Sequence, residues 1–125
     1  MGNPHCVFVV NDVDSLDLLD WGSKIESHEL FPQKTNVEFI QIIDKQTIRQ
    51  RTFERGVGET LACGSGACAA AVVANRKGLT DRNVDIHLDG GKLSIEWSED
   101  GVWMTGPTTI VFKGTLSAEF LKAVQ

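Results

Sequence analysis

The sequence predicts an α+β fold in which a mainly antiparallel sheet wraps around one central buried helix. Short β-rich segments recur along the chain, and turn residues such as Asp89-Gly90-Gly91 and Gly106-Pro107 separate them. One segment, 67–74, is rich in alanine and apolar on nearly all sides, which is typical of a buried helix. The 125 residues, of which 42% are hydrophobic, are enough for one domain with a real core.

The first part of the chain predicts a strand followed by two short helices. Residues 5–10 are apolar and β-rich, and therefore predict a strand. Asp14 is expected to cap a helix that Gly22 ends or bends, with the apolar residues Leu16, Leu18, Leu19 and Trp21. Residues 25–30 are expected to continue as a second short helix before Pro32.

A hairpin is predicted next. Asn36 opens a strand over 37–43, and the turn Asp44-Lys45-Gln46 leads into a second strand over 47–53. In the second strand two sets of residues alternate, Ile48, Gln50 and Thr52 with Arg49, Arg51 and Phe53. This alternation predicts that one face of the strand is wet.

The rest of the chain predicts the central helix and a series of short strands. The helix is expected over 65–77, with Gly78 as its left-handed stop. Ser117 is expected to cap a last helix over 118–124. Between these helices, strands are predicted at 84–88, 93–97, 102–105 and 110–113.

The charge balance argues against two classes of partner. The chain has 12 Lys+Arg and 17 Asp+Glu, which gives a net charge of −5. Nucleic acids and anionic membranes both require a basic face, so neither is expected as the main partner.

The longest apolar runs are a handful of residues, and none is expected to span a bilayer. The N-terminus lacks a basic region followed by a long apolar stretch, so we expect no secretory signal there.

The three cysteines, Cys6, Cys63 and Cys68, do not have the pattern of a disulfide framework. Cys63 and Cys68 are five positions apart, so on one helix they would point about 140° away from each other. Their Cα atoms would also be too far apart for an unstrained bridge. We therefore expect a reduced, cytoplasmic protein.

Cys63 is the most informative residue, because Gly64-Ser65-Gly66 follows it at the start of the central helix. The first N–H groups of a helix have no internal partner and carry partial positive charge. A thiol held there is expected to lose its proton more easily than a free one, and a carboxylate can bind the same N–H groups. The small residues expose these groups, which favours a chemical role for Cys63, whereas Cys6 and Cys68 are expected in the core.

Three further residues are candidates on less specific grounds. Arg55 is able to grip a carboxylate with its planar fork, and Glu54 an ammonium, although a solvated ion pair at a strand end is an equal alternative. His5 could cap a strand or tune an acid–base group.

Rival motifs fit less well. Gly64-x-Gly66-x-x-Ala69 has the spacing of a dinucleotide fingerprint, but the polar, glycine-rich segment 54–61 before it is not a buried parallel strand. A zinc site would need paired Cys or His residues at short spacing, which the chain does not supply convincingly. A Cys–His hydrolase with His5 as its base stays open.

Four motifs occur in order along the chain: Gly2-Asn3-Pro4-His5, Asn36-Val37-Glu38-Phe39, Glu54-Arg55-Gly56 and Ala62-Cys63-Gly64-Ser65-Gly66-Ala67. Together they resemble the C-terminal half of the diaminopimelate epimerases, and the resemblance runs over nearly the whole chain. Proline racemases and phenazine-pathway isomerases are similar in fold, but they are not expected to carry all four motifs.

The resemblance implies a two-base epimerisation of LL-diaminopimelate to meso-diaminopimelate, in lysine and peptidoglycan biosynthesis, without a cofactor or a metal. The family has two similar lobes with the site between them, and each lobe gives one cysteine. Residues 1–125 would be the C-terminal lobe, a single lobe of this two-lobed fold. The implied partners are the diaminopimelate substrate and the N-terminal lobe of the same enzyme, and a homodimer of the full enzyme is allowed.

The resemblance also implies roles for individual residues. Cys63 matches the catalytic cysteine of the C-terminal lobe, and His5 and Glu54 match residues that tune the cysteine pair. The positions that match substrate-holding residues are Asn3, Asn36, Glu54, Arg55, Gly64 and Ser65.

The main departure from the family is the missing partner cysteine, which neither Cys6 nor Cys68 matches. We therefore expect this chain alone to bind substrate weakly and not to turn it over. The alternatives are a non-catalytic substrate-binding or interaction domain on the same fold, or a related cofactor-independent amino-acid racemase. Because the last segment can cross to the other lobe in this family, residues 117–125 are expected to be misplaced or exposed here.

Overall fold

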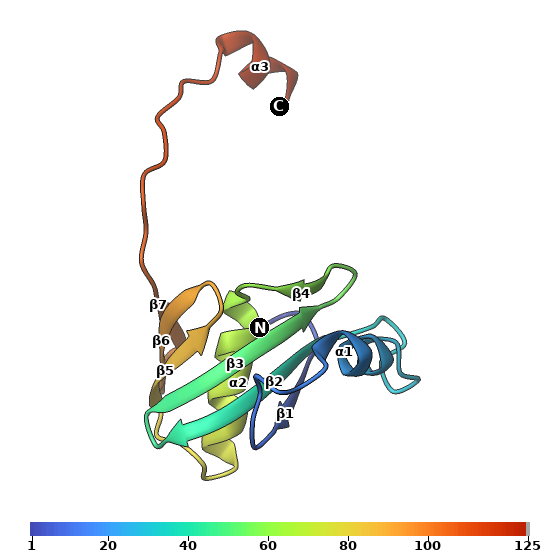
Figure 1. Ribbon diagram of the computed structural model, residues 1–125. Helices are drawn as coiled ribbons and strands as arrows, with labels where there is room; N and C mark the ends of the chain where they lie inside the picture. Colours follow the sequence, from blue (N-terminus) through green and yellow to red (C-terminus); the bar gives the residue numbers. More distant parts are fainter. Residues whose placement is uncertain (125) are drawn as a thin grey trace.

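The computed structural model describes residues 1–124, and a single curved sheet organises the part of the chain up to residue 105 (Figure 1). Its strands are β1 (His5–Val9), β2 (Asn36–Asp44), β3 (Thr47–Glu54), β4 (Gly58–Thr60), β5 (Asn83–Leu88), β6 (Gly91–Ser98) and β7 (Gly101–Thr105). The helices are α1 (Leu18–Glu26), α2 (Gly64–Arg76) and α3 (Ala118–Ala123). The strand order is β1-β2-β3-β5-β6-β7, and β4 pairs with β3. Only the β1–β2 and β3–β5 pairs of this sheet are parallel, so the prediction of a mainly antiparallel sheet is confirmed.

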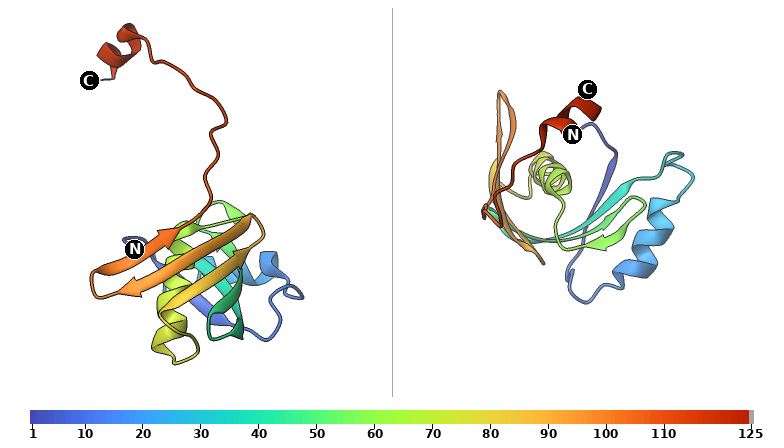
Figure 2. Two further views of the ribbon diagram at one scale, coloured as in Figure 1. Left: turned by 90° about the vertical axis from the view of Figure 1, so that its left-hand side faces the viewer. Right: turned by 90° about the horizontal axis from the view of Figure 1, so that it is seen from above.

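The sheet curls around α2, while α1 packs against its outer side (Figure 2). Helix α2 contributes alanines to the main core, where small side chains let the helix axis approach the strands closely. The predicted central buried helix and the α+β fold class are therefore confirmed. The buried residues of this core are Ile40, Ile48, Ala67, Ala70, Ala71, Ala74, Val84, Ile86, Leu88 and Ile95.

Strand β2 contributes side chains to two hydrophobic cores, one under α1 and one against α2, because successive side chains point to opposite faces of the sheet. Val37 and Phe39 pack with Leu18 and Phe53 under α1, whereas Ile40 packs on the α2 side. Glu38 lies between Val37 and Phe39 in the strand and is fully buried. The alternation therefore places a carboxylate on the face that α2 covers.

Helix α2 begins and ends close to the predicted residues. Cys63 is its N-cap, with extended backbone (φ −139°, ψ 108°), so the helix starts one residue earlier than expected. Gly78 has a φ of +72°, which confirms the predicted left-handed stop.

Helix α1 differs from the prediction in three ways. Its cap is Asp17, whose carboxylate accepts a hydrogen bond from the Asp20 N–H at 3.1 Å, so the prediction of Asp14 is wrong. Gly22 lies inside the helix and does not end it. Glycine is required there because a Cβ would overlap the ring of Phe53. Residues 25–30 form no second helix, since α1 runs on to Glu26 and a turn follows.

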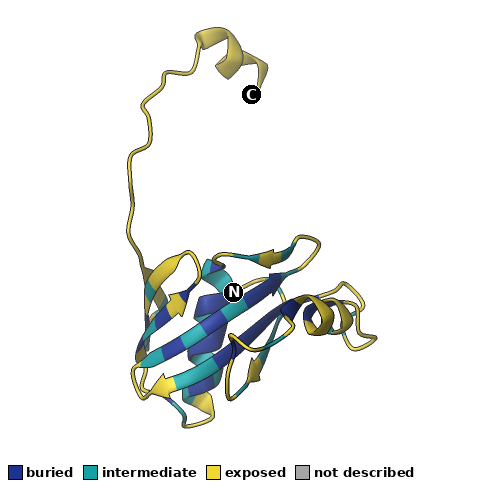
Figure 3. Ribbon diagram, in the orientation of Figure 1, coloured by how far each residue is buried: buried dark blue, intermediate teal, exposed yellow. Residues whose placement is uncertain are grey.

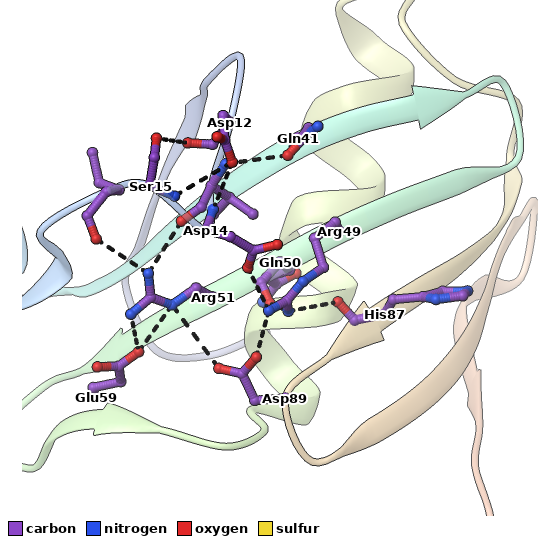
Figure 4. A network of polar contacts seen from close by, with 12 residues as sticks. Asp12, Asp14, Ser15, Gln41, Arg49, Gln50, Arg51, Glu59, His87 and Asp89 are labelled. Atoms are coloured by element: carbon purple, nitrogen blue, oxygen red, sulfur yellow. Dashed lines mark hydrogen bonds and ion pairs between the residues drawn. The ribbon is translucent and has the colours of Figure 1, made fainter.

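Asp14 belongs instead to a polar network on the outer face of the sheet (Figure 4). Arg49 pairs with Asp14 at 2.7 Å and also with Asp89. Arg51 binds Glu59 at 2.6 Å and donates to two backbone carbonyls of the segment before α1, at 3.1 Å each. The predicted wet face of β3 is thus polar, but ion pairs cover it, and Phe53 on that face is buried under α1.

The C-terminal segment leaves the body after β7 (Figures 1 and 3). The predicted strand at 110–113 is wrong: these residues are exposed and have no regular structure, because no strand lies beside them to pair with. Ser117 does cap α3, accepting from the Phe120 N–H at 3.1 Å, and the described residues 117–124 are exposed as expected. Gln125 lies outside the described residues.

The short strand β4 was missed by the sequence analysis. Among residues 1–124, no helix is long and apolar enough to cross a membrane.

Candidate functional site

The predicted site residues gather at one end of the sheet. His5 is in register with Asn36, so the parallel strands β1 and β2 begin side by side. Strand β3 runs antiparallel to β2 and therefore ends beside the start of β2, where Glu54 lies. The first turn of α2 is at the same end, because Gly66 lies against the Glu38 side chain. Four segments that are distant in sequence thus meet.

Cys63 lies where the sequence predicts, at the start of α2. Its sulfur accepts a hydrogen bond from the Gly66 N–H at 3.4 Å and lies 3.6 Å from the Ser65 hydroxyl. The residue is 7% exposed, so it is buried, but polar groups contact its sulfur. The N–H groups of Gly64 and Ser65 are at the first helical positions, which have no acceptor within a helix.

The expected lowering of the Cys63 pKa is wrong. Burial raises the pKa of this thiol, and the nearby carboxylates of Glu54 and Glu38 raise it further. The hydrogen bonds from Ser65 and the Gly66 N–H act in the opposite direction but do not outweigh burial. Helix-terminus reasoning omits desolvation, which disfavours the charged thiolate.

A chain of hydrogen bonds leads from the thiol into the sheet. The Asn3 amide nitrogen donates to the Ser65 hydroxyl at 3.5 Å, and the Asn3 amide oxygen lies 3.1 Å from Nε2 of His5. The other ring nitrogen of His5, Nδ1, lies 2.8 Å from Oε1 of Glu38. The structure therefore brings Asn3, His5, Ser65 and Cys63 together.

Glu38 is the member of this group that the sequence analysis did not single out. It is fully buried, and burial is the largest cause that raises its pKa, against the lowering effect of His5. A signal was available: a carboxylate stands inside the apolar strand segment 37–43, where charge is costly without a partner.

Asn36, Glu54 and Arg55 lie at the edge of the same end. The Asn36 side-chain oxygen accepts from the Arg55 backbone N–H at 2.8 Å, so Asn36 holds the chain at the end of β3. Glu54 accepts from the Thr60 hydroxyl at 2.7 Å. The Arg55 guanidinium is exposed and donates to the backbone carbonyl of Gln33 at 3.1 Å. Asn36 thus has a structural contact, whereas Arg55 is accessible to a ligand.

A hollow of about 390 Å³ lies elsewhere, between β5, β6 and β7. Its lining includes Asp85, Ser94 and Trp103 and contains none of the predicted site residues. The candidate site is therefore identified by its side chains and not by this hollow.

These groups have complementary chemistry. A helix terminus binds a carboxylate, the Glu54 carboxylate can hold an ammonium, and a thiol lies between donors that can stabilise its charged form. Such a set suits an amino acid whose α-carbon faces the sulfur. Of the chain's three cysteines, Cys63 is the one that belongs to this set.

Known proteins match this chain over nearly its full length. A protein-family model described as diaminopimelate epimerase matches residues 1–111. The diaminopimelate epimerases of Acinetobacter baumannii (strain AYE) and Acinetobacter baylyi (strain ATCC 33305 / BD413 / ADP1) are each 54% identical to it over 98% of the chain. The solved structure of a phenazine biosynthesis protein of the PhzF family from Enterococcus faecalis covers 98% of this chain and 44% of its own, with a TM-score of 0.69 at 18% identity, and shows the same fold.

The chain spans 44% of the length of the two Acinetobacter relatives. The family model nevertheless matches 111 of the 125 residues of this chain, including every predicted site residue. This chain belongs to the diaminopimelate epimerase family.

Proposed function

We propose that this chain is the C-terminal lobe of a diaminopimelate epimerase and that Cys63 moves one of the two protons of the reaction. Its family and the share of its relatives that it spans support this assignment. An N-terminal lobe with the second cysteine completes the site. Homodimerisation of the full enzyme and a cytoplasmic location belong to the same proposal.

The reaction exchanges one proton for another at the α-carbon. The Cα–H bond breaks and its proton passes to a thiolate, which becomes a thiol, while the electron pair stays on the substrate as a planar carbanion. The thiol on the opposite face then gives its proton to the carbanion and becomes a thiolate. Cys63 acts as the base for one epimer and as the acid for the other.

The start of α2 stabilises the charge that develops. The substrate carboxylate binds the N–H groups of Gly64 and Ser65, and gains from the positive helix terminus as the carbanion forms beside it. Glu54 takes the α-ammonium and tunes the thiol together with His5. Asn3, Asn36 and Arg55 hold the rest of the substrate, and the exposed side chain of Arg55 is open to a carboxylate.

One observation carries the proposal: the Cys63 sulfur lies within reach of the Gly66 N–H and the Ser65 hydroxyl, at 3.4 and 3.6 Å. Both groups can donate to a thiolate, and both lie in the first turn of α2, where the helix terminus also favours negative charge. The Gly66 contact also caps α2, so the nearby Ser65 hydroxyl is the group that a cysteine with only a capping role does not require.

The test compares the chain alone with a chimera. In the chimera, this chain replaces the matching part of the Acinetobacter baylyi diaminopimelate epimerase, to which it is 54% identical. Each protein is incubated with LL-diaminopimelate in deuterated water, and α-deuterium and meso product are measured by mass spectrometry and chiral chromatography. We expect deuterated meso product from the chimera and none from the chain alone. A folded chimera without exchange contradicts the proposed activity, and robust turnover by the chain alone contradicts the half-site claim.

A non-catalytic binding domain is the second candidate. The raised pKa of Cys63 favours it in one respect, because it lowers the fraction of thiolate, which is the form that acts as the base. In that case titration calorimetry would detect diaminopimelate binding to the chimera while α-deuterium exchange would be absent.

A further inference from the structure

Glu38 is the one fully buried charged side chain within residues 1–124. Its Oε1 atom lies 2.8 Å from Nδ1 of His5, and the His5 side chain is itself only 5% exposed. Its other oxygen, Oε2, has no hydrogen-bond partner among the described residues. Burial of an ionisable group is costly unless it is paired, and the contact with His5 offsets part of that cost: it lowers the pKa of Glu38, while burial raises it more strongly.

Gly66 brings this carboxylate close to the thiol. A Cβ at position 66 would lie 2.6 Å from Oε1 of Glu38 and 3.2 Å from the Cys63 sulfur. Glu38 is therefore wedged between the His5 ring and the first turn of α2. The titratable groups that act on it or on which it acts are His5 and Cys6 of β1, Glu54 of β3, and Cys63.

The hydrogen-bond chain has a direction. With the Asn3 amide oxygen facing Nε2 of His5, as in the structure, Nε2 carries a proton and donates it to Asn3, because an amide oxygen only accepts. The Asn3 amide nitrogen then donates to the Ser65 oxygen. Because Ser65 accepts from Asn3, its own hydrogen is free to point to the Cys63 sulfur, 3.6 Å away.

The opposite direction is possible in chemical terms. If Nε2 of His5 had no proton, the Asn3 amide would turn to donate to it and would present its oxygen to Ser65. The Ser65 hydroxyl would then donate to Asn3, and the sulfur would lose that donor. With Nε2 protonated, the second ring nitrogen and Oε1 of Glu38 share one proton between them.

We propose that Glu38 is a positioning residue which, through His5 and Asn3, directs the Ser65 hydroxyl toward the Cys63 sulfur. This inference rests on the proposed function for its catalytic meaning. The arrangement of the four side chains can be tested without it. The raised pKa of Glu38 is consistent with a pair that keeps its shared proton.

The first test is ¹⁵N NMR of His5 in the chain itself. We expect Nε2 to carry a proton that exchanges slowly and shows a through-space contact to the Asn3 side chain. Glu38→Gln is able to donate to Nδ1 and keeps this signal, whereas Glu38→Leu loses it. Thr52→Val is the matched control, because Thr52 is the fully buried cross-strand partner of Glu38 and lies outside the chain of hydrogen bonds. An unprotonated Nε2 in the unmodified chain overturns the inference, even if Glu38→Leu does not fold.

The second test measures kcat and KM of the same variants in the chimera. We expect Glu38→Leu to lower kcat by about tenfold or more with KM little changed, since a proton-transfer group is misdirected. Glu38→Gln is expected to recover most of this loss, and Thr52→Val to keep the parent kcat. Equal kcat for Glu38→Leu and the parent overturns the positioning role. A folded but inactive parent chimera contradicts the proposed function and leaves the NMR test to decide the inference.

Discussion

Gly66 and Glu38 are packed so closely that no side chain fits between them: a Cβ on Gly66 would lie 2.6 Å from the Glu38 carboxylate. Gly66 has an ordinary helical backbone, so its glycine is required by this contact and not by its conformation. The helix start and the buried carboxylate therefore constrain each other.

The Gly66→Ala change tests this contact. Alanine is the better helix former, yet we expect a loss of about 1–3 kcal/mol in the free energy of unfolding, because the buried carboxylate must move. Gly64→Ala is the comparison, since a Cβ there meets only the flexible tip of Met104, at 3.1 Å. Urea unfolding followed by circular dichroism gives both values. Equal stability of the two variants would show that the contact is not tight.

The buried Glu38 predicts a pH dependence of stability. Burial raises its pKa in the folded state above the ordinary value of about 4.3, so the folded state binds more protons than the unfolded state above that pH. Stability from this group is therefore present at low pH and is lost as the pH rises through the folded pKa. Glu38→Gln removes this loss.

The measurement is the free energy of unfolding of both proteins between about pH 4 and pH 8. We expect Glu38→Gln to gain stability relative to the parent as the pH rises, and Thr52→Val to show a constant difference. A parent and a Glu38→Gln variant with parallel pH profiles would mean that Glu38 has an unshifted pKa.

Alkylation rates report the Cys63 pKa. Burial and two carboxylates raise it, so we expect slow reaction with iodoacetamide at neutral pH and a rate that increases at higher pH. Glu54→Gln removes one carboxylate and should speed the labelling of Cys63. Cys68 is the internal control, because Glu54 does not contribute to the shift of its pKa. Peptide mapping by mass spectrometry separates the two sites, and fast labelling of Cys63 in the parent would contradict the raised pKa.

Arg51 ties the segment before α1 to β3 and β4 (Figure 4). We expect Arg51→Met to lower the free energy of unfolding by about 2 kcal/mol, because it leaves two part-buried carbonyl groups without this donor. Lys24→Met breaks a solvent-exposed pair with Asp20 and should cost less than about 0.5 kcal/mol. Chemical denaturation of both variants checks the difference. Equal losses in the free energy of unfolding would show that the Arg51 contacts do not stabilise the fold.

Local signals in the sequence predicted most of the body of the fold. The alanine run and Gly78 predicted α2, and the turn at Asp44-Lys45-Gln46 predicted the hairpin, because these signals act between near neighbours. The prediction of a strand at 110–113 was wrong because a strand depends on residues that are distant in the sequence. Its β-rich residues need a neighbouring strand, which sequence propensity cannot supply.

The sequence named four residues that the structure brings together, but not the contacts between them. Motifs placed Cys63, Ser65, Asn3 and His5 among the candidates, whereas the pairing of His5 with Glu38 spans 33 positions and depends on the parallel register of β1 and β2. The predicted direction of the Cys63 pKa shift was also wrong, because burial, which raises this pKa, is a property of the packed structure.

The most direct measurement of the role of Cys63 is α-deuterium exchange in the chimera with one cysteine changed at a time. We expect Cys63→Ser to abolish formation of deuterated meso-diaminopimelate and Cys6→Ser, a half-buried cysteine of β1, to leave it near the parent rate. Circular dichroism and gel filtration confirm that both variants are folded. Parent-like exchange by a folded Cys63→Ser chimera would show that this sulfur does not carry the proton.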